Sequence, residues 1–183
     1  LCPMVLIITA ALVLISGPAS ADPNSGQRPV SEIRIGWLAH DIDAISFNRE
    51  DGSDLNLEVL FRPLPLAIMQ RLGSPRPHAG VSVNSDGHTS QAYAGLTWHL
   101  PMADNFFFEA MAGGTVHDGD TDPETPERKA LGARMLFRLG ASVGYRVTDR
   151  ISVSILFDHI SNACLKDANE GLDNLGIRLG YRF

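Results

Sequence analysis

Apolar and polar residues alternate with a period of two along most of the chain after residue 31. The clearest stretch is 133–147, where methionine, phenylalanine, leucine, valine and tyrosine fall on one face and arginine, serine and glycine on the other. Successive side chains of a strand point to opposite sides, so this pattern predicts strands with one apolar face. The sequence predicts eight strands, at 32–40, 55–62, 78–84, 91–100, 105–116, 133–147, 151–157 and 175–183.

Two all-β architectures accept this pattern, a soluble sandwich and a barrel in the outer membrane. Strand length favours the barrel. A membrane-spanning strand needs about 9–11 residues, whereas strands of soluble proteins typically have about 5–6. The stretches 91–100, 133–147 and 174–183 reach the longer value. We therefore predict an all-β fold, an eight-stranded antiparallel transmembrane β-barrel of the Gram-negative outer membrane.

The polar face supports the same interpretation. It mixes large charged side chains with glycine, as expected for a narrow barrel interior in which ion pairs fill the lumen. The charged members of this face are Glu32, Arg34, Glu58, Glu109, Arg134, Arg138, Arg146, Arg178 and Arg182. The connections 101–105 and 148–150 are short, as periplasmic turns should be, and the acidic connection 117–130 is long, as an extracellular loop should be. The connection 63–77 does not fit, because it is long at a periplasmic position.

The first 21 residues are predicted to be a signal peptide. Met4 to Ile15 is almost entirely apolar, and Ala19-Ser20-Ala21 forms a small-residue cleavage site. Residues 22–31 are then a polar leader and 32–183 the barrel. The formal net charge of −6 argues against a nucleic-acid partner.

Three polar residues break the apolar face of the last two predicted strands. His159 and Ser161 continue the lipid-facing parity of 151–157, and Asp173 continues that of 175–183. These strands are joined by one hairpin, so the three side chains should meet on the outer wall of the barrel near its extracellular rim. Lumen packing does not explain an imidazole, a hydroxyl and a carboxylate at this place, although polar residues at a strand end also occur simply because water reaches them.

The three side chains can perform acyl transfer. A serine hydroxyl becomes nucleophilic when an imidazole takes its proton, and a carboxylate orients that imidazole. Asn162, Asn169 and backbone N–H groups of 161–171 could stabilise the oxyanion. Two alternatives stay open. One is a non-enzymatic structural or adhesive barrel that acts through the loop 117–130, and the other is a phospholipase on the same scaffold.

The run H-I-S-N-A at 159–163, followed by N-E-G-L-D-N-L-G-I-R-L-G-Y-R-F at 169–183, resembles the carboxy-terminal signature of the outer-membrane lipid A 3-O-deacylase family. The resemblance implies an eight-stranded barrel that removes an ester-linked acyl chain from lipid A of lipopolysaccharide. It implies Ser161 as nucleophile and His159 as general base. Asp173 stands where the best-known family pattern has Glu, and Glu170 is the alternative acid. Asn162 and Asn169 match family asparagines, with Asn169 the preferred oxyanion donor.

The implied partners are lipid A, the outer membrane and, through Phe183, the barrel-assembly machinery. We expect no cofactor and no metal. His117, Asp118, Asp120 and Asp122 have part of the spacing of a calcium loop but lack a closing glutamate, which favours a solvated loop. Trp37 and Trp98 have lipid-facing parity and are interpreted as wall residues.

Overall fold

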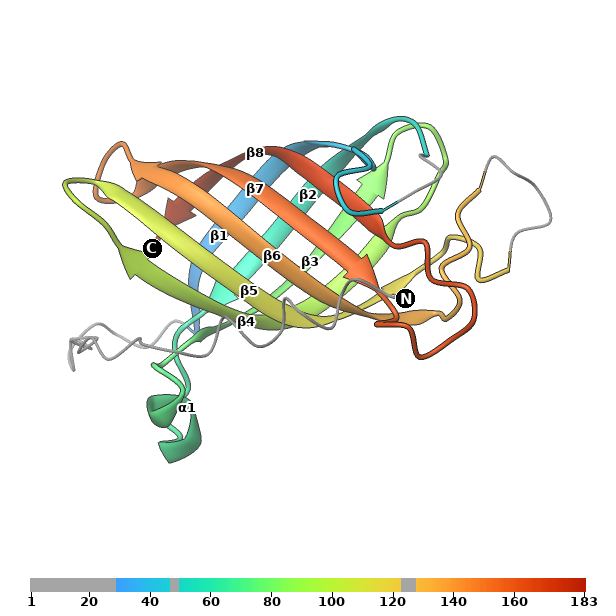
Figure 1. Cartoon of the computed structure of the whole chain (residues 1–183). Helices are drawn as coiled ribbons and strands as arrows, with labels where there is room; N and C mark the ends of the chain where they lie inside the picture. Colours follow the sequence, from blue (N-terminus) through green and yellow to red (C-terminus); the bar gives the residue numbers. More distant parts are fainter. Residues whose placement is uncertain (1–28, 47–49, 123–127) are drawn as a thin grey trace.

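A computed structural model describes residues 29–46, 50–122 and 128–183, so the predicted signal peptide and most of the predicted leader lie outside the described residues. The chain forms a closed barrel in which each strand pairs with its sequence neighbours and β1 pairs with β8. All pairs are antiparallel (Figure 1), which confirms the predicted fold. The strands are β1 (Val30–Ala39), β2 (Ser53–Phe61), β3 (Arg76–Asn84), β4 (Gln91–Pro101), β5 (Phe106–His117), β6 (Met135–Arg146), β7 (Ile151–Ser161) and β8 (Leu172–Arg182).

The strands form where the alternation is strong, because most apolar side chains share the parity that reaches the outer wall. A few apolar side chains of the other parity, such as Leu38, Met111 and Leu156, pack inside the barrel. Trp37, Met135 and Ile177 are more than half exposed, and the register places their strand neighbours on the same face. Together they form a continuous apolar belt around the barrel, as membrane-spanning barrels require. Among the described residues, no helix has the length and apolar character needed to cross a bilayer.

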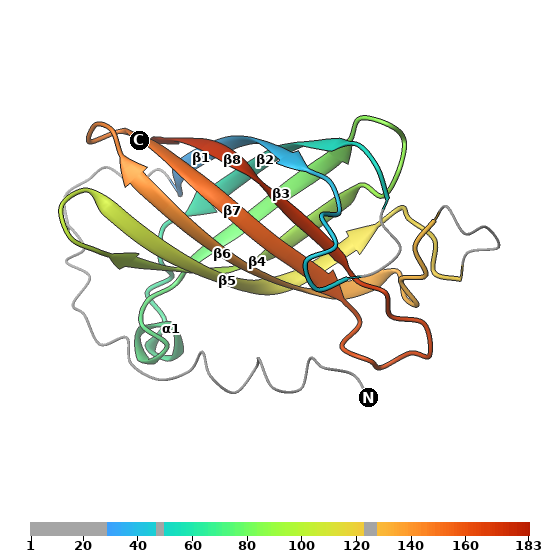
Figure 2. The same ribbon diagram turned by 45° about the horizontal axis from the view of Figure 1, so that its top comes forward.

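Two features differ from the sequence-based boundaries. β7 extends to Ser161 and β8 begins at Leu172, so the polar end of this hairpin belongs to the sheet and not to a loop. The misfit connection between β2 and β3 contains a short helix, α1 (Ala67–Arg71), which the alternation did not predict. In both views α1 lies to the side of the barrel at the end that also holds the carboxy terminus (Figures 1 and 2).

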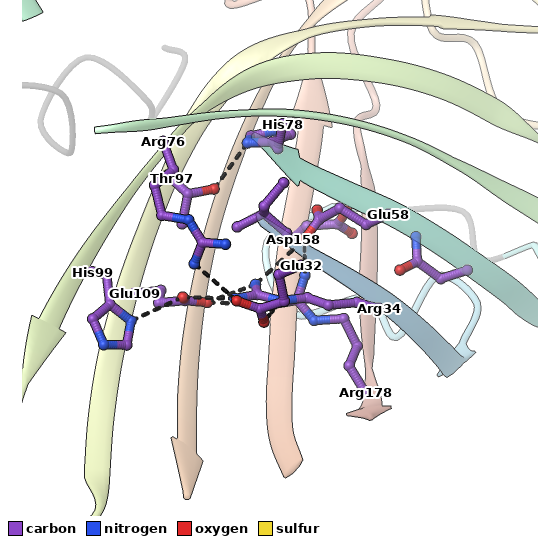
Figure 3. Close-up of polar contacts among 12 residues, drawn as sticks. Glu32, Arg34, Glu58, Arg76, His78, Thr97, His99, Glu109, Asp158 and Arg178 are labelled. Carbon is purple, nitrogen blue, oxygen red and sulfur yellow. Dashed lines mark hydrogen bonds and ion pairs between the residues drawn. The ribbon is translucent and has the colours of Figure 1, made fainter. Parts of the chain in front are cut away.

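Buried ion pairs fill the lumen, as the sequence predicted. Arg34 contacts Glu32 at 2.7 Å and both carboxylate oxygens of Glu109 at 2.7 and 2.8 Å (Figure 3). Arg178 donates to Glu58 at 2.9 Å. Because each buried charge has an opposite partner nearby, the desolvation cost of the interior is offset. Also in the lumen, Nε of Arg138 donates to Oδ2 of Asp158 at 2.7 Å, and the guanidinium carbon of Arg138 lies 3.8 Å from the ring centroid of Tyr93.

Arg134 was among the arginines predicted to line the lumen, and for this residue the prediction is wrong. β6 begins one residue later, so Arg134 lies exposed in the preceding connection, where its guanidinium donates to the carbonyl oxygen of Gly119 at 2.7 Å.

An apolar cluster occupies the loop-bearing end of the barrel. It consists of Leu131, Leu136, Ile160 and Leu172. Ile160 lies between His159 and Ser161 on β7 and therefore points to the opposite side of the sheet. The two predicted catalytic side chains thus project outward from a strand whose inner side, at this end, packs against apolar side chains.

Candidate active site

The register of the sheet places the three predicted catalytic residues on one face. His159 is directly opposite Asp173 in the β7–β8 pair and opposite Leu139 in the β6–β7 pair. Ser161 is opposite Phe137, which is half exposed on the apolar belt. Side chains of directly paired residues point to the same side of a sheet. All three therefore have the outward parity of the sheet, although each side chain is buried, at the end of the barrel that carries the connections 40–52, 118–134 and 162–171.

His159 and Asp173 are joined by a short hydrogen bond. The imidazole Nδ1 lies 2.6 Å from Oδ1 of Asp173. When Nδ1 donates to this carboxylate, Nε2 is left with the lone pair that a general base needs. Although its side chain is one methylene shorter than glutamate, Asp173 reaches the imidazole. Glu170, the alternative acid, instead accepts a hydrogen bond from the backbone N–H of Ala130 at 2.7 Å.

The connection between β1 and β2 orients the Asp173 carboxylate. The backbone N–H groups of Ile45 and Ser46 donate to its Oδ2 at 2.5 and 2.8 Å. The N–H of Ile42 donates to the Asp173 carbonyl oxygen at 2.8 Å. One carboxylate oxygen thus faces the imidazole and the other is held by the loop, which fixes the plane of the carboxylate.

A buried lysine anchors the same loop. Lys129 Nζ lies 2.8 and 2.9 Å from the two carboxylate oxygens of Asp41 and donates to the carbonyl oxygen of Gly171 at 2.7 Å. Asp41 also accepts from the N–H of Glu50 at 2.8 Å. Sequence reasoning did not find these contacts, because they join the β1–β2 connection, the β5–β6 connection and the start of β8.

His40 belongs to the same cluster of buried contacts. We call the cluster of His40, Asp41, Glu50 and Lys129 the cap. Its Nδ1 lies 2.8 Å from Asp54 and its Nε2 3.3 Å from Glu50. Burial would lower the pKa of His40, but the hydrogen bonds to Asp54 and Glu50 outweigh burial and raise this pKa to about 9. Burial would raise the pKa of Glu50, but hydrogen bonds from His40 and from the N–H groups of Lys129 and Thr89 lower it to about 2.

We predict that the cap loses stability at alkaline pH. The folded-state pKa of His40 lies above its ordinary value, so its contribution is complete below about pH 6.5 and is lost as pH rises through about 9. The free energy of unfolding should fall by an amount on the order of 1–3 kcal/mol. Thermal unfolding midpoints between pH 7 and pH 10 measure it. The His40→Gln variant should show a flatter dependence in this range, and equal slopes for the two proteins would contradict the assignment.

The two predicted asparagines have different contacts. Nδ2 of Asn162 donates to two backbone carbonyl oxygens, that of Leu131 at 3.0 Å and that of Ala168 at 2.6 Å, so both of its N–H groups are used within the protein. The backbone N–H of Asn162 donates to Oδ1 of Asn169 at 2.9 Å. The Asn169 Nδ2 makes a longer contact of 3.4 Å to the sulfur of Cys164. Of the two asparagines, Asn169 is therefore the one whose side-chain N–H groups are better placed to donate to a ligand.

Gly171 lies directly against the imidazole of His159. It has a φ of +69°, and a Cβ added there would lie 2.9 Å from His159 Cε1. We predict that Gly171→Ala displaces the imidazole and lowers hydrolytic activity about 10- to 100-fold, because misplacing a catalytic group by about 1 Å has an effect of this size. Initial rates of acyl release measure it. Gly87→Ala is the matched control, since Gly87 also has a positive φ, of +79°, but a Cβ added there would have no neighbour within 4 Å. Unchanged activity of Gly171→Ala would contradict this placement of His159.

The remaining sequence candidates lie elsewhere. His117 Nε2 is 2.7 Å from the Ala133 carbonyl oxygen, and Asp118 accepts from the N–H of Ser90 at 2.6 Å. Trp37 is 61% exposed on the outer wall. Within the described ranges, no group of three or more histidine, cysteine, aspartate or glutamate side chains is arranged to hold a metal ion.

Comparison with known proteins identifies the family of the chain. A sequence model described as lipid A 3-O-deacylase (PagL) matches residues 76–182, which is more than half of the chain and includes His159, Ser161 and Asp173. The chain belongs to the lipid A 3-O-deacylase (PagL) family. Lipid A deacylase PagL of Bordetella bronchiseptica is 28% identical over 99 residues, which are 54% of this chain and 53% of that protein. The chain thus spans about half the length of the curated relative it matches.

Solved structures support the fold of the PagL family. The crystal structure of the outer membrane enzyme PagL matches with a TM-score of 0.62 and 16% identity over 84% of this chain and 100% of that chain. Neisserial surface protein A matches with a TM-score of 0.53 and 11% identity, over 83% of this chain and 96% of that chain. At these identities the likeness concerns the fold alone. The barrel is of the outer-membrane type, as predicted.

Proposed function

We propose that this protein is a serine esterase of the outer membrane that hydrolyses the ester-linked acyl chain at the 3-O position of lipid A. The observation that carries the proposal is the 2.6 Å contact between His159 Nδ1 and Asp173 Oδ1, on the same outer face as Ser161. Membership of the lipid A 3-O-deacylase family supports the proposed substrate class and acyl position.

The proposed reaction has two halves. Nε2 of His159 takes the proton of the Ser161 hydroxyl while Oγ attacks the ester carbonyl, which forms a tetrahedral oxyanion. The oxyanion collapses, the bond to the sugar oxygen breaks, and the imidazolium returns its proton to that oxygen. Water then attacks the acyl-serine with His159 again as base, which releases the fatty acid and regenerates Ser161. Asp173 stays ionised and stabilises the imidazolium in both halves.

Asn169 is the proposed side-chain donor to the oxyanion. Its Oδ1 is held by the backbone N–H of Asn162 at 2.9 Å, so the orientation of its amide is fixed before substrate arrives. Asn162 acts as a positioning residue, since its own amide ties Leu131 to Ala168.

The location suits a lipid substrate. Acyl chains of the outer leaflet lie against the apolar belt, and the proposed triad lies at the rim where that belt ends. The ester linkages of lipid A are also near this depth, between its sugars and its hydrocarbon. A charge near the interface costs roughly 0–1 kcal/mol, compared with about 2–4 kcal/mol for Arg or Lys at the midplane. A buried and hydrogen-bonded Asp173 is therefore tolerable here.

Expression in a Gram-negative host that lacks such an enzyme tests the proposal. Mass spectrometry of extracted lipid A should show loss of one 3-O-linked hydroxyacyl chain, and the free hydroxy fatty acid should appear. Purified protein should act on lipid A and not on glycerophospholipid vesicles. Hydrolysis of the vesicles alone would instead indicate a phospholipase, and no hydrolysis of either would favour a non-enzymatic barrel. Recognition of Phe183 by the barrel-assembly machinery stays a prediction.

A further inference from the structure

The connection between β2 and β3 carries a run of exposed apolar side chains. It reads R-P-L-P-L-A-I-M-Q-R-L from residue 62 to 72, and we call it the foot segment. Leu64, Leu66, Ile68 and Leu72 are 43%, 50%, 56% and 40% exposed. A run of this kind facing water would be unfavourable, and exposed apolar patches mark surfaces that contact another apolar phase.

The foot segment is attached to the outer wall of the barrel and does not cover its mouth. The indole N–H of Trp98 on β4 donates to the Leu72 carbonyl oxygen at 2.7 Å. Trp98 shares its strand face with other apolar residues of the belt, such as Leu96 and Leu100. Figures 1 and 2 agree that α1 projects sideways from the barrel at the end opposite the proposed triad. The foot segment thus continues the lipid-facing surface at its periplasmic edge.

The charges and the helix geometry also fit a membrane interface. Ile68 and Leu72 are one helical turn apart, and the Leu72 N–H donates to the Ile68 carbonyl oxygen at 3.1 Å, so both side chains share one face. Gln70 is exposed and points away from that face. Arg62 precedes the apolar run and Arg71 lies within its last turn, with no acidic residue between them. Apolar side chains flanked by arginines are typical of segments that lie in the plane of a bilayer surface.

We propose that the foot segment binds the periplasmic leaflet of the outer membrane, with its leucine and isoleucine side chains among the acyl chains of glycerophospholipids and Arg71 at their phosphates. A lipid surface is the occupant that fits best, because the segment adjoins the apolar belt at the level where that belt meets phospholipid headgroups. The barrel then contacts lipid A at one end and phospholipid at the other.

Site-specific photocrosslinking tests the proposal. The full-length protein would carry p-benzoylphenylalanine in place of Ile68, Gln70 or Leu57, one position at a time. Each protein is reconstituted in vesicles of phosphatidylethanolamine and phosphatidylglycerol and irradiated, and adducts are identified by intact mass. Leu57, which is 47% exposed on the belt, is the positive control, and Gln70 on the polar side of α1 is the matched negative control.

We expect a phospholipid adduct at Ile68 in a yield within about twofold of that at Leu57 and at least fivefold above that at Gln70. Equal yields at Ile68 and Gln70, with the Leu57 adduct present, would overturn the proposal. A predominant chain-to-chain adduct at Ile68 would also overturn it and would identify the surface as an interface between copies. Heat-modifiable mobility establishes that each variant is folded, the Leu57 adduct establishes that lipid crosslinking works in these vesicles, and neither readout depends on hydrolytic activity.

Discussion

Replacing Ser161 with alanine is expected to reduce release of the 3-O-linked acyl chain on the order of 10⁴-fold or more, which brings it to the background of the assay. The substitution removes the atom that forms the acyl-enzyme in the proposed mechanism, and losing the nucleophile of a serine triad typically has an effect of this size or larger. Ser161 lies at the end of β7, where the change from hydroxyl to hydrogen leaves the backbone pairing with Phe137 unaltered. Initial rates on purified lipid A in mixed micelles, followed by mass spectrometry, measure the loss.

Ser154→Ala is the matched control for this experiment. Ser154 lies on the same strand but faces the lumen, directly opposite Arg178 in the register. Its variant should keep activity within about twofold of wild type. Both variants should keep heat-modifiable mobility on gels. A Ser161→Ala protein that is folded and still releases acyl chains at the wild-type rate would remove Ser161 from the mechanism.

The second large effect is expected for Asp173→Asn. An asparagine can present its amide N–H to Nδ1 of His159, which favours the tautomer with the proton on Nε2 and removes the base. In a serine triad this exchange costs about 10⁴-fold in kcat. The asparagine carbonyl can still accept from the N–H groups of Ile45 and Ser46, so the loop between β1 and β2 keeps its contacts. The kcat for acyl release, with KM measured in parallel, should therefore fall without loss of the fold.

Glu170→Gln separates the two candidate acids. Glu170 accepts from the N–H of Ala130, a contact that glutamine can reproduce. We expect its activity to stay within about threefold of wild type. A large loss in Glu170→Gln together with a small loss in Asp173→Asn would reverse the assignment of the acid.

The strands could be predicted because their information is local. In β6 every second side chain from Met135 to Tyr145 reaches the outer wall, and the alternation alone determines the element. The end of β7 was underestimated, because His159 and Ser161 break the apolar face on which the prediction depended. The short helix α1 was missed for a related reason. Its apolar residues are set among prolines and follow neither period over a useful length.

The contacts that orient the candidate site are not local. Asp173 is held by Ile45 and Ser46, which precede it by 128 and 127 positions. Lys129 reaches Asp41 across 88 positions. Nothing in the neighbourhood of these residues in the sequence distinguishes them from the other charged residues of long loops. Only closure of the barrel, which places β1 beside β8, brings the β1–β2 connection over the hairpin that carries the proposed triad.

The ion pairs that fill the lumen have a consequence for the cell. Because Arg34, Glu58, Glu109 and Arg178 are paired across the interior, we expect the barrel to offer small solutes no passage. Insertion of this protein should therefore leave the permeability barrier of the outer membrane intact. Conductance of planar bilayers should stay at baseline after insertion, and any traffic of lipid to and from the protein has to occur sideways, by diffusion within the leaflet.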